Sequence, residues 1–345
     1  MNFSNSLLQW YLQNKRDLPW RNTTNAYPIW LSEIMLQQTR VAQGLPYFIA
    51  FTEAFPTVFD LAKANEEQVL KLWQGLGYYS RARNMHKTAQ IIVSNYNGNF
   101  PDNYSGLLKL KGIGEYTAAA IASFAFNEVV PVVDGNVYRV LARYFDIETD
   151  IASSSARKEF TALAKELISV DNPALFNQAI MEFGALQCVP KNPNCGICIF
   201  SSSCAALQKK KVDKLPVKLK KTKVTNRYFN YLVFLDKENN TIINKRTEKG
   251  IWQNLYEFPV IETNEEVGFE TITEAVKTSF SDLKIESVSP YNNQQIIHKL
   301  SHQKLHINFY KIMVSDKIVD GIELDLLKNY PFPIVIYNFI EKYSI

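Results

Sequence analysis

The four cysteines of the chain lie close together, and their spacing is that of a ligand set. They are Cys188, Cys195, Cys198 and Cys204, separated by six, two and five residues. Four soft thiolates in one loop suit a tetrahedral zinc ion or a [4Fe–4S] cluster. A disulfide framework would spread its cysteines through the chain, and four inert buried thiols packed so closely would be unusual. The side chains alone leave zinc and iron–sulfur open.

Two carboxylates have surroundings that should drive their pKa values apart. Glu33 lies in an apolar stretch at 29–39 that is expected to be helical, with Trp30 beside it, so burial should raise its pKa and make it an acid. Asp134 precedes a helical stretch at 137–144 and is expected to cap it, which is also its simplest structural role. Helix N–H groups should lower its pKa and keep it ionised. One protonated and one ionised carboxylate suit the cleavage of a glycosidic bond.

A glycine turn with a helical pattern on either side offers a phosphate site. Gly112 and Gly114 separate residues 103–109 from residues 117–126. The glycines allow a tight turn and leave backbone N–H groups facing outward at the start of the next helix, where they bind a phosphate without reading a base. Such a turn alone is weak evidence. The prediction is strengthened because Asp134 follows the turn in the sequence by about the length of one helix.

Helices and strands must position these residues, and the spacing of apolar side chains predicts that these elements form two domains. Residues 1–207 are expected to form a helical domain, with a helix–hairpin–helix at about 103–126 and the cysteine loop at 188–204. A lysine-rich linker should follow at 208–224. Residues 225–345 should form a smaller α+β domain. Its expected strands are 228–235, 241–244 and 305–313, and its expected helices are 271–280 and 326–345.

Length and composition agree with this division. At 345 residues the chain exceeds a comfortable single core, and 46% hydrophobic with 21% charged residues is ordinary for a globular protein. The net charge of +4 permits a nucleic-acid partner without requiring one. No stretch is long and apolar enough to cross a bilayer, and no secretory signal is present. These absences predict a cytoplasmic protein without a membrane partner. We also expect a monomer that is associated with a bacterial nucleoid.

The hairpin, Asp134 and the cysteine spacing, in this order, resemble the helix–hairpin–helix glycosylases of the endonuclease III superfamily across residues 1–205. The resemblance implies an all-α glycosylase core that works in base excision repair. It also implies that the four cysteines hold a [4Fe–4S] cluster. Members that cut the strand carry a lysine just after the hairpin for a Schiff base. That position is Tyr116 here, so the enzyme should be monofunctional.

Four blocks resemble the MutY-type adenine DNA glycosylases: residues 18–21, 31–39, 75–84 and 182–185. The resemblance implies that Glu33 protonates N7 of a flipped adenine and then assists water. Asp134 would stabilise the cation, with Tyr116 and Asn136 in support. The remaining implied roles are an adenine pocket lined by Arg21 and Glu182, and DNA contacts at the gap and the opposing base by Gln38, Thr39, Leu76 and Tyr78.

The second domain resembles the Nudix-like domain of the same family, which senses 8-oxoguanine opposite the adenine. The expected helix at 271–280 lacks the glutamate cluster of a working Nudix site, so we expect binding without catalysis. Ser301 and His302 match the family's recognition hairpin, whereas Leu300 replaces its usual aromatic residue. A metal site at the nearby histidines is not expected, because their surroundings alternate as a strand.

The expected substrate is therefore duplex DNA with adenine opposite 8-oxoguanine or guanine. Three alternatives remain at this point. A sibling glycosylase would act on another mismatched base. A catalytically silent DNA-damage-binding protein would tolerate the loss of Glu33. A zinc protein of unrelated chemistry would lack visible absorbance.

Overall fold

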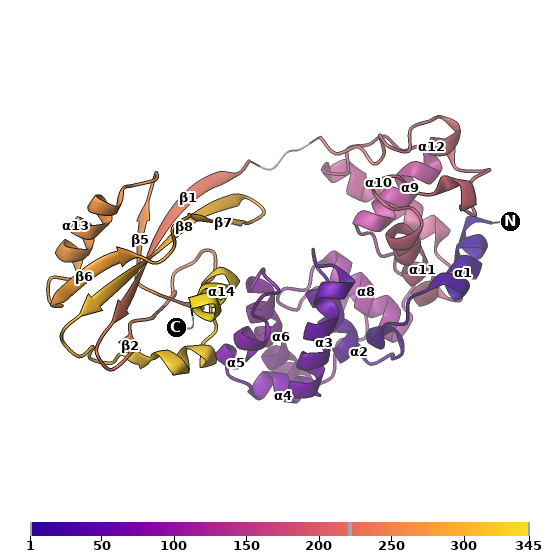
Figure 1. Ribbon diagram of the computed structural model, residues 1–345. Coiled ribbons are helices and arrows are strands. Elements are labelled where there is room, and N and C mark those ends of the chain that lie inside the picture. The colour runs from indigo at the N-terminus through magenta and orange to yellow at the C-terminus, as the bar shows by residue number, and fades with distance from the viewer. Residues whose placement is uncertain (1, 220–222, 344–345) are drawn as a thin grey trace. The chain divides into compact units, whose positions relative to one another are not determined.

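The computed structural model describes residues 2–219 and 223–343 (Figure 1). The chain forms two compact units, of which the first contains residues 1–63 and 84–220 and the second residues 64–83 and 221–345. In the described residues no helix is long and apolar enough to cross a membrane.

The first unit is helical. Helix α11 (Pro173–Leu186) packs against α1 (Phe3–Asn14), α8 (Glu115–Phe126) and α9 (Gly135–Phe145), and α2 (Ala26–Met35) packs against α8. Side chains of Asn2, Asn25, Asp134 and Ser153 accept hydrogen bonds from the first turns of α1, α2, α9 and α10 (Ser154–Leu167), as N-caps do. The other helices of this unit are α3 (Val41–Ala54), α4 (Val58–Lys63), α6 (Ser80–Tyr96, from Asn84 onward), α7 (Tyr104–Leu107) and α12 (Ala205–Gln208), with 3-10 turns at Pro19–Arg21 and Cys195–Ile197.

The second unit is built on a mixed sheet of order β5-β1-β8-β6, to which β7 is added beside β8. β1 (Thr225–Leu235) runs parallel to β8 (Gln303–Val314), with Tyr231 opposite Phe309. The pairs of β8 with β6 (Ile285–Pro290) and β7 (Ile296–Lys299), and of β1 with β5 (Val260–Thr263), are antiparallel. Four two-residue strands pair beside this sheet: β2 (Asn240–Thr241) with β9 (Ile322–Glu323), and β3 (Asn244–Lys245) with β4 (Tyr256–Glu257).

Helices cover both faces of the sheet, and the alternation of side chains along β1 and β8 explains why. Leu232 and Ile312 point to the face that packs against α13 (Phe269–Ser279). Phe309 points to the other face and stacks on Phe339 of α14 (Ile334–Tyr343), with ring centroids 3.7 Å apart. Figure 1 shows the two helices on opposite sides of the strands. A helical core with a smaller α+β unit is thus the expected fold class.

Four details differ from the expectations. α2 ends at Met35, so residues 36–39 lie in a turn, where Gln38 has a φ of 55°. The helix expected at 326–345 is a 3-10 turn (Leu324–Asn329) and α14, separated by Pro331 and Pro333, and residues 344–345 lie outside the described residues. The strand expected at 241–244 is divided between β2 and β3. α13 begins at Phe269 and so includes Glu270 as well as Glu274.

The expected linker also differs, because residues 208–219 pack on the helical unit. Leu215 is buried, and the Ile151 N–H donates to the Val217 carbonyl at 3.0 Å. Lys209 and Lys211 form ion pairs with Asp146 at 2.7 and 3.1 Å, so these lysines compensate an acidic helix end. Residues 220–222 of the expected linker lie outside the described residues.

Residues 64–83 form the largest departure from the expected domain ranges. They include α5 (Glu66–Leu72) and the turn after it, and they lie inside the sequence of the helical domain. By their contacts, however, they belong to the second unit.

Candidate active site and nucleic-acid interface

Glu33 and Tyr116 meet at the centre of the helical unit. Glu33 lies on α2 with 7% of its surface exposed, and the Tyr116 hydroxyl, on α8, donates to Glu33 Oε2 at 2.8 Å. Burial raises the pKa of Glu33, the hydrogen bond from Tyr116 opposes the rise, the charge of Asp134 adds to it and Arg21 opposes it, and the resulting pKa is about 7. The expected raised pKa is confirmed. A carboxyl with this pKa can give and take a proton near neutral pH.

Asp134 is the N-cap of α9, as its place in the sequence predicted. Its Oδ1 accepts from the Asn136 and Val137 N–H groups, both at 2.8 Å, and its Oδ2 accepts from Asn136 Nδ2 at 2.7 Å. The predicted lowering of its pKa is wrong: burial raises the pKa of Asp134, although these hydrogen bonds and the Arg139 charge oppose the rise. The donors favour the ionised carboxylate, but the loss of water around it has the larger effect.

Arg139 was missed by the sequence analysis, and it connects this carboxylate site with the cysteine loop. Its Nη2 donates to Asn136 Oδ1 at 2.8 Å and to the Gly184 carbonyl at 2.7 Å, while its Nε donates to the Cys188 carbonyl at 2.7 Å. Gly184 lies so close that a Cβ there would come within 2.7 Å of the Asn136 Cβ. The position of Arg139 three residues after Asn136 on one helix was the available signal.

Arg21 and Glu182, the predicted adenine pocket pair, form a buried ion pair with a third member. Arg21 donates to both Glu182 carboxylate oxygens, at 3.0 and 2.7 Å. Arg16 does the same at 2.8 and 2.6 Å, and its backbone N–H adds a bond of 2.9 Å. Although burial alone would raise it, the pKa of Glu182 is lowered to about 2 by these two arginines. Arg16, which lies five residues before Arg21, was not predicted from the sequence as part of this site.

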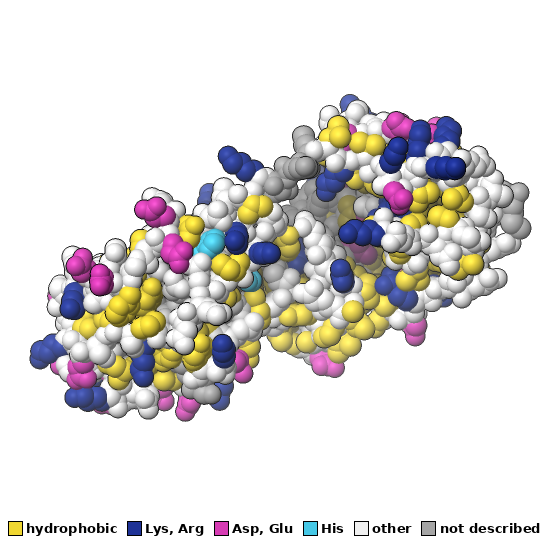
Figure 2. Space-filling view, turned by 45° about the horizontal axis from the view of Figure 1, so that its top comes forward, with side chains coloured by type: hydrophobic (Ala, Val, Ile, Leu, Met, Phe, Trp, Pro, Cys, Tyr) yellow, Lys and Arg dark blue, Asp and Glu magenta, His cyan; other side chains and the backbone are white. Residues whose placement is uncertain are grey.

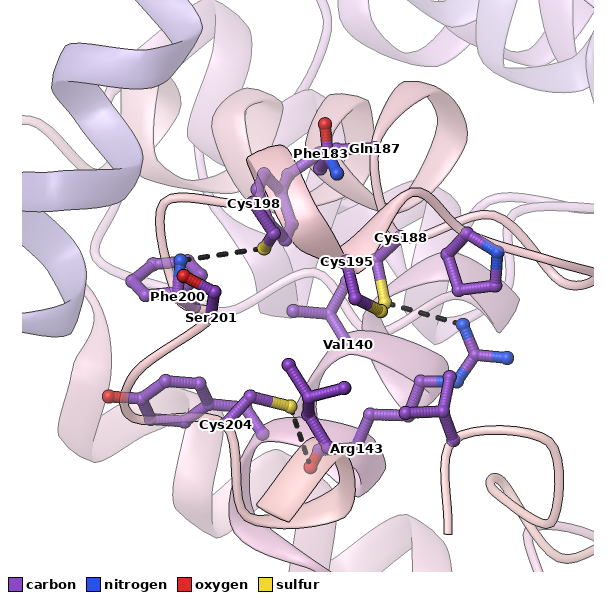
Figure 3. A pocket seen from close by; sticks show the side chains of 14 residues that line it. Val140, Arg143, Phe183, Gln187, Cys188, Cys195, Cys198, Phe200, Ser201 and Cys204 are labelled. Carbon is purple, nitrogen blue, oxygen red and sulfur yellow. Dashed lines mark hydrogen bonds between the residues drawn. The ribbon is translucent and has the colours of Figure 1, made fainter. Parts of the chain in front are cut away.

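The four cysteines line one pocket, and their sulfur atoms point into a shared space (Figure 3). Arg143 Nη1 donates to Cys188 Sγ at 3.4 Å and the Phe200 N–H to Cys198 Sγ at 3.4 Å. Burial raises the pKa of Cys198 to about 11, so a bound cation would be required to hold four thiolates together. Among the described residues no three His, Cys, Asp or Glu side chains already converge on one metal position. The donor set, four thiolates in one loop, fits a metal–sulfur group.

The glycine turn has the predicted hairpin geometry. Gly112 has a φ of 76°, and Gly114 is the N-cap of α8. The Thr88 hydroxyl donates to the Lys111 carbonyl, and a Cβ on Gly112 would come within 2.8 Å of the Asn84 Cβ, so α6 braces the hairpin. In the view of Figure 2, lysine and arginine side chains lie on the visible face of the helical unit among hydrophobic and a few acidic side chains.

In the second unit, the turn after α5 and the hairpin between β7 and β8 line a common cavity of about 550 Å³. The hydroxyls of Tyr78 and Ser301 are 2.7 Å apart at this cavity, and His302 also lines it. Tyr78 is 45% exposed, whereas Leu76 is only 4% exposed, and the contact of each with DNA stays a prediction. Gln38 and Thr39 lie in the turn after α2 in the other unit.

Comparison with known proteins agrees with this arrangement. Residues 31–166 match the HhH-GPD superfamily of base excision DNA repair proteins, and residues 230–342 match the NUDIX domain family. An adenine DNA glycosylase of Buchnera aphidicola subsp. Acyrthosiphon pisum (strain APS) is 38% identical over 308 residues, which cover 89% of this chain and 85% of that protein.

Two solved structures share the helical fold. A thermostable thymine-DNA glycosylase is 29% identical with a TM-score of 0.55, covering 60% of this chain and 95% of that chain. An endonuclease III in a trapped covalent intermediate with DNA is 22% identical with a TM-score of 0.53, covering 60% and 94%, and supports the fold alone. With the sequence relative matched over most of both lengths, the chain belongs to the MutY-type adenine DNA glycosylases of the HhH-GPD superfamily.

Proposed function

We propose that this protein removes adenine from duplex DNA by hydrolysing the N-glycosidic bond, where the base opposite is 8-oxoguanine or guanine. The observation that carries the proposal is Glu33: a buried carboxyl with a pKa of about 7, hydrogen-bonded to Tyr116 and within the electrostatic influence of Asp134. Such a group is protonated often enough to act as an acid and ionised often enough to act as a base. The adenine must leave the base stack to reach it.

The reaction begins with a proton from Glu33. Transfer to N7 of the adenine neutralises the charge that develops on the leaving base, and the bond between C1′ and N9 breaks with its electron pair on the base. The sugar is left as an oxocarbenium cation. The Glu33 carboxylate then takes a proton from water as the water oxygen bonds to C1′, which regenerates the acid.

Asp134 stabilises the cation. Its two oxygens accept three hydrogen bonds from the start of α9 and from Asn136, all of which favour the ionised carboxylate. A buried anion beside a developing positive charge is more effective than one in water. Asn136 is held for this task by Arg139.

The same site should not cut the strand. Tyr116 takes the position from which a lysine would form a Schiff base with the sugar. Its phenol is instead committed to Glu33. Water is therefore the nucleophile, and the product is an intact backbone with an abasic site.

Recognition of the opposing base is assigned to the second unit. Tyr78, Ser301 and His302 place two hydroxyls and an imidazole around one cavity. These are hydrogen-bonding groups suited to the edge of an oxidised purine. We assign the four cysteines to a [4Fe–4S] cluster, which when bound would cross-link the loop and hold it on α9.

The test is an excision assay on end-labelled duplexes carrying adenine opposite 8-oxoguanine, guanine or thymine, with half of each sample heated in alkali. We expect breaks only after alkali, and fastest opposite 8-oxoguanine. Breaks without alkali would indicate a strand-cleaving sibling, and excision of another base a different specificity.

Glu33→Gln provides the control for chemistry. It should lower the single-turnover rate by about 10²- to 10⁴-fold. Glu166→Gln makes the same change at an exposed position of α10 and should have no effect. A Glu33→Gln protein with the wild-type rate would leave a DNA-binding protein without this catalytic mechanism.

A further inference from the structure

Glu67, on α5, accepts hydrogen bonds from one residue of β3 and one residue of β4. The turn that contains Tyr78 follows this helix. Lys245 Nζ and the Tyr256 hydroxyl both lie 2.8 Å from the same oxygen, Glu67 Oε1. The two donors can reach one acceptor because Lys245 and Tyr256 are directly opposed in the antiparallel pair of β3 and β4. The hydrogen bond from Lys245, and then that from Tyr256, lower the pKa of Glu67, so the carboxylate is ionised at neutral pH.

Further contacts fix the same helix along its length. Asn254 Nδ2 donates to Glu66 Oε1, and Lys71 Nζ donates to the Tyr330 carbonyl at 3.1 Å. The Phe332 N–H donates to Gln74 Oε1 at 3.1 Å. Every partner lies in the same unit, so α5 is held from its first turn to its last, and Gln74, which follows the helix, is held as well.

The turn that follows depends on such anchors because it has an irregular backbone. Gly75, Gly77 and Tyr78 have φ values of 99°, 77° and 49°. A non-glycine residue in the left-handed region is held there by its surroundings. After the turn, Arg83 Nη1 donates to the Gln253 carbonyl at 2.7 Å, which fixes the other end.

We propose that Glu67 is a positioning residue for recognition of the base opposite the adenine. Through Lys245 and Tyr256 it fixes α5, and α5 fixes the turn from which Tyr78 reaches Ser301. Glu67 touches neither the base nor the reacting atoms. This inference rests on the proposed role of Tyr78 and Ser301 in reading that base.

The consequence is a specific defect in discrimination. Glu67→Ala removes both contacts, whereas Glu67→Gln keeps an amide oxygen that accepts from the Tyr256 hydroxyl and loses only the charge. The ratio of single-turnover excision rates opposite 8-oxoguanine and opposite guanine should fall by about fivefold in Glu67→Ala and by less in Glu67→Gln. Lys245→Met should match Glu67→Gln, and the double variant Glu67→Gln with Lys245→Met should lower the ratio no further than either of these two single variants.

The matched control is Lys317→Met, since Lys317 forms an exposed 2.7 Å ion pair with Glu238 in the same unit. It should leave the ratio unchanged, and the melting temperature of each variant identifies general destabilisation. Equal loss of both rates in Glu67→Ala, or an unchanged ratio, would overturn the inference.

Tyr78→Phe and Ser301→Ala separate the two hypotheses. If these variants lower the ratio and Glu67→Ala does not, only the positioning role fails. If none of the three changes the ratio, the proposed reading of the opposing base fails as well.

Discussion

The Tyr116 hydroxyl donates to Glu33 Oε2 at 2.8 Å and opposes the effect of burial, which raises the pKa of this carboxyl; the resulting pKa is about 7. The pKa of Glu33 on α2 thus depends on Tyr116 of α8. Because Glu33 must carry that proton when the bond to adenine breaks, the rate should fall as pH rises through about 7.

Tyr116→Phe should move this alkaline limb to higher pH. The substitution removes the hydrogen bond that favours the ionised carboxylate, so the Glu33 pKa rises and the acid stays protonated for longer. The measurement is the single-turnover excision rate between about pH 5.5 and 9.

Tyr104→Phe is the matched control, since Tyr104 lies on α7 of the same unit. Its pH profile should coincide with that of the wild type. A limb that moves to lower pH in Tyr116→Phe would contradict the assignment of Glu33 as the acid.

Arg139→Lys should slow excision by about tenfold, or about 1.4 kcal/mol. A lysine ammonium cannot meet the Asn136, Gly184 and Cys188 oxygens in the geometry of the guanidinium fork. Asn136 would then be less well held against Asp134. The readouts are the single-turnover rate and the dissociation constant for DNA, of which only the first should change.

The control for Arg139 is the same substitution at Arg227, whose two-pronged contact with Glu262 lies in the second unit. Arg227→Lys should leave the rate unchanged. Weaker DNA binding with a normal rate in Arg139→Lys would place its role outside the chemistry.

The motif residues were predictable because each local signal is carried by a few neighbouring positions. Asp134 before a helix, glycines in a hairpin and four spaced cysteines all took the expected local places. The contacts that complete the site join distant positions. Arg16 and Glu182 form a hydrogen bond although they are 166 residues apart in the sequence, and Glu67 and Lys245 do so at a separation of 178 residues. The spacing of residue types along the chain does not predict such pairs.

Burial explains the other differences. Packing inside the second unit leaves Leu76 4% exposed, a burial that its block of sequence does not predict. Asp134 has the donors that the capping argument required, but its loss of water outweighs them in the direction of the pKa shift. Both quantities depend on the whole fold around a residue.

Purified protein should contain iron and acid-labile sulfide in equal amounts, with a visible absorbance. Cys198→Ser should lose most of this absorbance, because one of the four soft ligands becomes a hydroxyl. Elemental analysis of the wild type and the variant is the measurement. Zinc in place of iron, with a colourless wild-type protein, would contradict the assignment.

Glu182→Gln should destabilise the helical unit by about 3 kcal/mol at neutral pH, since the pKa of Glu182 is about 2 against an ordinary value of 4.5. The lowered pKa means that this stability is fully present above pH 4.5 and is lost as pH falls towards 2. The substitution leaves Arg16 and Arg21 without a charged partner. Denaturant unfolding of both proteins at several pH values measures the difference.

The pH dependence of this stability difference distinguishes a contribution of the Glu182 charge from a contribution of side-chain packing. The difference in unfolding free energy between wild type and Glu182→Gln should shrink as the medium becomes acidic, because protonated Glu182 resembles the amide. Glu262→Gln, at a partner of Arg227 that is 41% exposed, should change stability by less than about 1 kcal/mol at any pH. A Glu182→Gln difference that stayed constant with pH would mean that shape, and not charge, makes this pocket stable.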